Sequence, residues 1–278
     1  MVFRAALLTL FLLGLCVGTA GASTGAPLCL RCHEVHYDSQ GACTDCHRGH
    51  PGTTRRDIAH DRFVPGRFAT FGQEDSLVVK RGTNLTEKAG CRRCHTLGGK
   101  GTTLASNLDR TAVATPPLEL EESIRQPVAL MPDFRFGSDD LAALVTLLLK
   151  EGVASPRQDS ETPLVIHFEK EGAASENIFA KRCGGCHRAL TVKEGGLGDG
   201  ETAPNLSGLL TPHYPRSAEK PGKDAPWSEK DLEEWLKNPR KLRPLTRMLP
   251  IAFKEGEFQQ LLQTLHIPTS PLAEPATP

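Results

Sequence analysis

The sequence has no excess of charge of either sign and few residues from which to build large hydrophobic cores. Lysine plus arginine and aspartate plus glutamate each number 33 in 278 residues, so no net charge favours binding to nucleic acid or to an anionic membrane. Only 38% of residues are hydrophobic and 5% are aromatic, whereas there are 26 glycines and 21 prolines. No collagen, coiled-coil or multispanning membrane pattern is present. The chain is therefore either rich in loops or packed around something other than side chains.

The first 22 residues have the layout of a secretory signal peptide. Arg4 precedes an apolar run over residues 5–17, and a small-x-small site follows at Ala20-Gly21-Ala22. This run is shorter than the roughly 18 or more apolar residues of a membrane-spanning helix, although an uncleaved anchor is the alternative. We expect removal of residues 1–22, Cys16 included, and export of the mature chain to the periplasm. No other segment is apolar for long enough to span a bilayer.

The eight remaining cysteines all fall in the pattern C-x-x-C-H, which is the attachment sequence of haem c. Two thiols form thioethers with the haem vinyl groups, and the next residue, histidine, binds the iron. Zinc knuckles, structural disulfides or a thioredoxin-like redox pair also use paired cysteines, but none of them explains a histidine after every pair. We therefore predict four covalently attached haem c groups. The cysteines are Cys29, Cys32, Cys43, Cys46, Cys91, Cys94, Cys183 and Cys186, and the proximal histidines are His33, His47, His95 and His187.

Two C-terminal segments share one plan. Residues 120–127 read LEESIRQP and residues 232–239 read LEEWLKNP, in register at an offset of 112 residues (120 to 232), and each follows a C-x-x-C-H. Met131 and Met248, the only methionines besides the initiator, come next, and helical patterns follow at residues 138–150 and about 255–266. The order of features resembles class I cytochrome c domains. The resemblance implies that Met131 and Met248 bind the irons opposite His95 and His187.

The second copy matches the class I pattern better than the first. Pro204 lies where, in that family, a proline carbonyl orients the proximal histidine, here His187. The first copy has Ser106 at the corresponding place and only 36 residues between His95 and Met131 (95 to 131). We expect a compact first module at residues 81–150, a linker at 151–163, a second module at 164–267 and a disordered tail at 268–278.

The N-terminal segment, residues 23–80, resembles bis-histidine multihaem cytochromes. It contains no methionine, and it repeats the frame C-x-x-C-H-x-x-H at Cys29 and Cys43. A histidine three residues after the proximal ligand points away from its own haem and can reach a neighbouring one. We predict His36 and His60 as the two distal ligands, with a short helix over residues 53–60 carrying His60. His50, in a Gly-His-Pro turn, is the competing candidate.

Together these features predict a mostly α fold, with a loop-rich dihaem segment followed by two small helical cytochrome c-like domains packed around haem. Because histidine–methionine ligation raises the potential of haem iron, electrons would run from the N-terminal to the C-terminal haems. We expect a periplasmic electron carrier with donor and acceptor proteins as partners, including a membrane quinol-oxidising or reductase complex, and with no small-molecule substrate. The alternative is a haem oxidoreductase of the peroxidase, thiosulfate or nitrogen-oxide type, which needs an open iron.

Five basic residues without an intervening acid lie just before Met248. They are Lys237, Arg240, Lys241, Arg243 and Arg247. Such a cluster steers an acidic redox partner to an exposed haem edge, or it is simply the solvated end of a helix.

Overall fold

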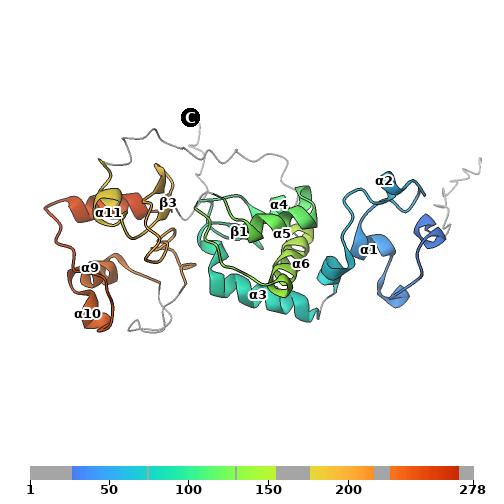
Figure 1. Cartoon of the computed structure of the whole chain (residues 1–278), viewed down its shortest axis with the longest axis horizontal. Coiled ribbons are helices and arrows are strands. Elements are labelled where there is room, and N and C mark those ends of the chain that lie inside the picture. The colour runs from blue at the N-terminus through green and yellow to red at the C-terminus, as the bar shows by residue number, and fades with distance from the viewer. Residues whose placement is uncertain (1–26, 74, 129, 155–175, 216–225, 269–278) are drawn as a thin grey trace, which may run out of the picture.

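The computed structural model describes residues 27–73, 75–128, 130–154, 176–215 and 226–268, and these residues are mostly helical. Figure 1 shows three units in a row, with the N-terminal segment at one end, a helical module in the middle and a second module at the other end. The predicted signal peptide, most of the predicted linker and nearly all of the predicted tail lie outside the described residues.

The N-terminal unit is rich in loops, as expected. Its elements are short: η1 (Leu28–Arg31), η2 (Asp38–Gln40), α1 (Cys43–His47) and α2 (Arg56–Ala59), and none of them contains a buried residue. The predicted helix over 53–60 is limited to α2, because Thr53 Oγ1 accepts a hydrogen bond from the Arg55 amide (3.1 Å) in a turn outside the helix. His60 directly follows α2 and forms its C-terminal cap.

The central module is built around one apolar helix, α6 (Ser138–Ala154), which is buried over most of its length. Packed on it are α3 (Leu77–Ala89), α4 (Leu108–Ala114) and α5 (Pro117–Arg125). Gly82 allows α3 to approach closely, since a Cβ at this position would collide with the Ala143 carbonyl oxygen of α6. The module also contains η4 (Cys91–Arg93) and a small antiparallel pair, β1 (Thr96–Leu97) with β2 (Lys100–Gly101).

The central core extends back into residues that were predicted to belong to the N-terminal segment, 23–80. Val64 and Phe68 are fully buried, and with Phe71 they belong to the same apolar cluster as the helices of the central module. Phe68 and Phe71 lie in η3 (Gly66–Gly72), which packs on α6. The predicted boundary at residue 80 thus falls inside α3, and the polypeptide joins the central core from about residue 64 onward.

A buried carboxylate links η3 to the central helices. Glu121 of α5 is 4% exposed and forms ion pairs with Arg67 of η3 and with Arg125, one turn along its own helix. Burying a charged carboxylate costs free energy unless it is paired, and the two arginines offset this cost for Glu121.

The C-terminal module repeats parts of this plan in smaller elements. It comprises α8 (Ile178–Arg182), the antiparallel pair β3 (Ala189–Thr191) and β4 (Gly195–Leu197), α9 (Glu229–Lys237), α10 (Pro239–Leu242) and α11 (Glu257–Leu265). Ser228 and Asp231 form a capping box at the start of α9, and Pro239 begins α10. The helix predicted over about 255–266 is α11, and that predicted over 138–150 is α6, which continues to Ala154.

None of the helices in the described part of the chain has both the length and the hydropathy needed to cross a membrane.

Candidate haem sites

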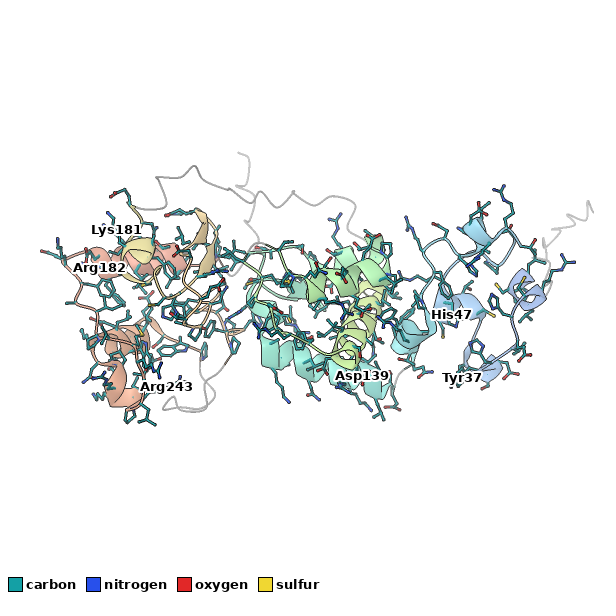
Figure 2. All side chains as sticks on the ribbon, in the orientation of Figure 1. Tyr37, His47, Asp139, Lys181, Arg182 and Arg243 are labelled. Atoms are coloured by element: carbon teal, nitrogen blue, oxygen red, sulfur yellow. The ribbon has the colours of Figure 1, made fainter. Side chains whose placement is uncertain are left out.

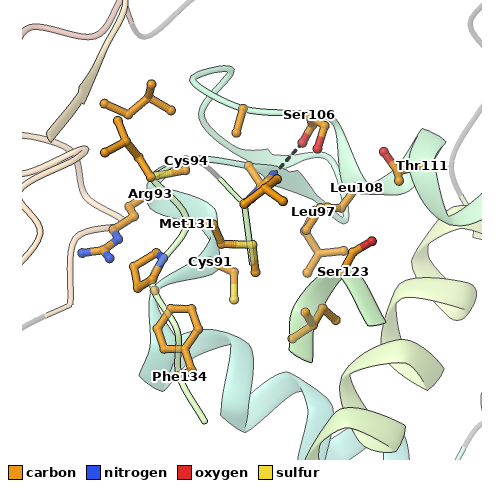
Figure 3. Close-up of a pocket in the computed structure, with 18 of the residues that line it drawn as sticks. Cys91, Arg93, Cys94, Leu97, Ser106, Leu108, Thr111, Ser123, Met131 and Phe134 are labelled. Atoms are coloured by element: carbon orange, nitrogen blue, oxygen red, sulfur yellow. Dashed lines mark hydrogen bonds between the residues drawn. The ribbon is translucent and has the colours of Figure 1, made fainter. Parts of the chain in front are cut away.

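A cavity of about 870 Å³ lies beside the C-x-x-C-H segment of the central module. Cys91, Cys94, His95 and Met131 all line it, so the predicted attachment points and both predicted iron ligands face one space (Figure 3). Most other lining residues are apolar, among them Leu97, Leu108, Leu120, Leu144, Leu148 and Phe134. Apolar walls with a few convergent ligand groups suit a large, flat, mostly hydrophobic cofactor, so the residues present fit a haem c group.

The ring of His95 is oriented by the backbone. Its Nδ1 lies 2.8 Å from the carbonyl oxygen of Ser106 and donates to it, which leaves Nε2 without its proton and free to bind metal. Burial lowers the pKa of His95, and the bond to Ser106 opposes this shift only in part. A neutral imidazole with a fixed tautomer is the form that ligates iron.

The C-terminal module has the same arrangement, with the proline that the class I resemblance implies. His187 Nδ1 donates to the carbonyl oxygen of Pro204 at 2.7 Å. In both modules a glycine with positive φ lies directly against the proximal histidine: a Cβ at Gly101 would collide with the carbonyl oxygen of His95, and one at Gly198 would collide with that of His187. Ser106 thus replaces the missing proline, and the two modules are structural duplicates around their histidines.

Met248 is half-buried against the core of the C-terminal module and already has a polar partner. The indole Nε1–H of Trp235 donates to Met248 Sδ at 3.0 Å. The guanidinium of Arg243 lies 5.8 Å from the centre of the Trp235 ring on the same side of the module. In the sequence Trp235 belongs to the repeated LEEWLKNP segment, and no role was predicted for it. The available signal was its position in α9, one helical turn before Pro239 and close in sequence to Met248.

In the N-terminal unit the histidines come together in two pairs. His36 Nε2 and His47 Nε2 are 3.3 Å apart, and the rings of His33 and His60 have their centres 6.0 Å apart at an interplanar angle of 62°. A metal–imidazole bond is about 2 Å long, so two nitrogens bound to opposite sides of one metal are about 4 Å apart. The two nitrogens of the His36–His47 pair are close to this spacing, and the rings of His33 and His60 are near enough to approach one metal from two sides. His50 instead lies 3.8 Å from Asp61.

His47 is held from outside its own unit. Its Nδ1 donates to the carbonyl oxygen of Val64 at 2.9 Å, and Val64 is fully buried in the core that continues into the central module. Each of the proximal rings His47, His95 and His187 is thus fixed by a backbone carbonyl through Nδ1. Such bonds set the ring orientation and increase the basicity of the ligand nitrogen.

The cysteines are unpaired in the described part of the chain, and two of them are poorly ionised. Burial raises the pKa values of Cys91 and Cys183 to about 11, although Arg93 and Arg182 respectively oppose the shift. The thiolate is the reactive form of cysteine, and at neutral pH these two thiols are mostly in the less reactive, protonated form. A thioether removes the buried ionisable group altogether.

Two exposed apolar side chains lie close in sequence to Met248 and to the basic cluster (Lys237, Arg240, Lys241, Arg243 and Arg247). Leu245 is 96% exposed and Leu249 is 68% exposed. Figure 2 shows Arg243 in the unit at one end of the row and His47 in the unit at the other end. Of the other histidines, His167 lies outside the described residues, His266 follows α11, and His213 lies near Arg92 and Glu87 at the junction of the two modules.

Comparisons with known proteins agree with this geometry. The family described as "Cytochrome C oxidase, cbb3-type, subunit III" matches residues 78–148, from α3 into α6. The chain is 33% identical over 93 residues to "Cytochrome c" of Nigella damascena, which covers 31% of this chain and 79% of that protein. It is 32% identical over 93 residues to "Cytochrome c" of Guizotia abyssinica, with the same coverage. It is 35% identical over 91 residues to "Cytochrome c" of Cannabis sativa, covering 30% of this chain and 77% of the relative.

Proposed function

Since the chain belongs to the cytochrome c family, we propose that it is a four-haem electron relay, with two bis-histidine haems followed by two histidine–methionine haems. The observation that supports this most strongly is the arrangement of the ligands. Each C-x-x-C-H in the described chain has a second candidate ligand: a histidine in the N-terminal unit or a methionine in each C-terminal module.

The ligand pairs of the N-terminal unit follow from the ring contacts. We assign His33 and His60 to the first haem and His47 and His36 to the second. His36 then crosses from the first attachment segment to the second haem, as the C-x-x-C-H-x-x-H frame predicts. His50, whose described partner is Asp61, is not assigned to an iron.

In the C-terminal modules we assign His95 with Met131 and His187 with Met248. Haem supplies one-electron oxidation and reduction when bound. The residues of the chain supply its surroundings: the Ser106 and Pro204 carbonyls hold the two imidazoles, apolar walls exclude water, and the Trp235 indole donates to the Met248 sulfur. Because methionine ligation raises the potential, electrons would move downhill from the N-terminal unit to the C-terminal module.

The surface at the C-terminal end is suited to an acidic redox partner. Basic residues lie close in sequence to the exposed Leu245 and Leu249, which flank Met248. Positive charge speeds encounter with an acidic protein, and exposed apolar side chains can make the close contact. The family model that matches the central module carries the name of an oxidase subunit. We therefore propose a periplasmic protein that passes electrons to or from a membrane respiratory complex, after removal of residues 1–22.

A redox titration of the holoprotein, followed optically and by electron paramagnetic resonance, tests this function. We expect four low-spin haems in two potential groups, a mass that corresponds to four covalent haems, and no reaction with carbon monoxide. Fewer haems would overturn the tetrahaem assignment. A high-spin haem that binds carbon monoxide would overturn the relay and identify an enzyme with an open iron.

A further inference from the structure

Asn205 of the C-terminal module contacts the loop of the central module that contains Leu130 and Met131. The Asn205 side chain donates from Nδ2 to the carbonyl oxygen of Leu130 at 3.1 Å, and Leu130 directly precedes Met131. The Leu130 side chain lies on Gly196 of β4, where a Cβ would come within 2.5 Å of Leu130 Cδ1. Leu190, Glu194, Gly196 and Gly198 of the C-terminal module also line the cavity that holds Met131. The loop with the predicted ligand of one module is therefore held by the other module.

The backbone of Asn205 holds the attachment segment of the central module as well. Its carbonyl oxygen accepts hydrogen bonds from the Arg93 guanidinium and from the Tyr214 hydroxyl, each at 3.1 Å. Arg93, between Cys91 and Cys94, is only 8% exposed, and its guanidinium lies over the Tyr214 ring at 5.6 Å from the ring centre. In Figure 3 this guanidinium points away from the Cys91 and Met131 side chains, toward the ribbon of the C-terminal module.

The same turn orients the proximal histidine of the C-terminal module. Pro204, which accepts the hydrogen bond from His187, is the residue before Asn205. Asn205 Oδ1 accepts from the Ser207 amide at 2.9 Å, and Ser207 Oγ accepts from the Leu190 amide at 2.7 Å. These bonds fix the turn, so a displacement of Asn205 also displaces the Pro204 carbonyl.

We propose that Asn205 is a positioning residue shared by both C-terminal haem sites, coupling the Met131 loop and Arg93 of one to the His187 ring of the other. This inference rests on the proposed assignment of Met131 and His187 as iron ligands. Its consequence is that the two sites keep a fixed mutual position, and that a change at Asn205 in the C-terminal module alters the haem of the central module.

The variant Asn205→Asp separates the two contacts of the side chain. A carboxylate oxygen can still accept from the Ser207 amide, but it cannot donate to the Leu130 carbonyl. Asn238→Asp is the matched control, because Asn238 is an exposed cap whose side chain accepts from the Lys241 amide at 3.2 Å, which aspartate can also do. It adds the same charge to the same module away from the junction.

Hydrogen exchange of the holoprotein provides a readout that does not depend on ligation. Loss of one hydrogen bond should speed exchange in the peptide containing Leu130 and Met131 by up to about tenfold in Asn205→Asp, and leave it unchanged in Asn238→Asp. The methionine–iron charge-transfer band of the central haem can be assigned by its loss in Met131→Ala. This band should weaken in Asn205→Asp and stay unchanged in Asn238→Asp. Asn205→Ala should in addition shift the potential of the haem bound by His187.

The outcomes distinguish the inference from the function on which it rests. Exchange in the peptide as slow as in the wild type, or equally fast in both aspartate variants, would overturn the role of Asn205. If exchange is faster in Asn205→Asp but the wild type shows no methionine band, the role of Asn205 in holding the Leu130 loop is supported and Met131 is overturned as a ligand.

Discussion

The hydrogen bond from Trp235 to Met248 allows a prediction about the potential of the haem that we propose for the C-terminal module. The indole Nε1–H lies 3.0 Å from the sulfur. A donor at the sulfur withdraws electron density from the iron ligand, which disfavours the ferric state and raises the reduction potential. Trp235→Phe keeps an aromatic ring in the core but removes the donor, so we expect the potential of this haem to fall.

The size of the shift follows from the strength of such a bond. A neutral hydrogen bond contributes about 0.5–1.5 kcal/mol net, and thioether sulfur is a weak acceptor, so about 0.5–1 kcal/mol is the appropriate range. For a one-electron couple about 59 mV corresponds to a factor of ten, or about 1.4 kcal/mol. Only the part of this energy that differs between the ferrous and ferric states shifts the potential, so the full bond strength is an upper limit. We therefore expect Trp235→Phe to lower the potential by up to about 45 mV, measured by potentiometric titration.

Trp227→Phe is the control for loss of indole packing. Trp227 lies edge-on to Trp235 with ring centres 6.1 Å apart, so it belongs to the same aromatic pair, whereas the described bond to the Met248 sulfur comes from Trp235. The methionine charge-transfer band must persist in both variants, which shows that the ligand is still bound. An unchanged or raised potential in Trp235→Phe, or an equal fall in Trp227→Phe, would refute the reasoning.

Three further predictions concern the other units. His60→Ala should convert one haem to a high-spin form that binds carbon monoxide, while His50→Ala leaves the spectra unchanged; the reverse result would exchange the two assignments. Arg240→Glu with Lys241→Glu should slow oxidation by the anion ferricyanide at low ionic strength and have little effect at about 1 M salt. If the double variant and the wild type are oxidised at the same rate at both ionic strengths, the basic cluster does not steer a charged partner. Glu121→Gln should lower the free energy of unfolding by about 1–3 kcal/mol in chemical denaturation, because two arginines lose their buried partner, and no change would show that the pairs are energetically silent.

Much of the fold and of the site chemistry was predictable because its signals are local. The cysteine motifs, the mostly helical fold and the start of α6 at Ser138 each follow from a few neighbouring residues. The hydrogen bond between His187 and Pro204 followed from a local motif through the class I resemblance. Gly152 was taken as part of a linker, yet it lies within α6, where a Cβ would approach the Asp109 carbonyl oxygen to 2.9 Å. A glycine that breaks a helix and one that permits close packing are the same in sequence.

The contacts that were not predicted join residues far apart in the chain. Asn205 meets Leu130, and His47 meets Val64 through backbone atoms that leave no pattern in the sequence. Val64, Phe68 and Phe71 were assigned to the N-terminal segment, residues 23–80, and only the packing on α6 shows that they belong to the central core. Periodicity predicts which face of an element is buried, but it does not predict the element against which that face packs.

The hydrogen bond from His47 to Val64 determines how much of the chain must be transferred together when a chimera is made. A chimera that joins the first 62 residues to another cytochrome would carry His47 without the carbonyl that holds its ring, since that carbonyl belongs to a residue buried in the neighbouring core. The exchangeable unit is therefore longer than the stretch that bears the first two attachment motifs. Breakpoints between residues 47 and 64 should therefore be tolerated poorly, because they separate the His47 ring from the Val64 carbonyl that holds it.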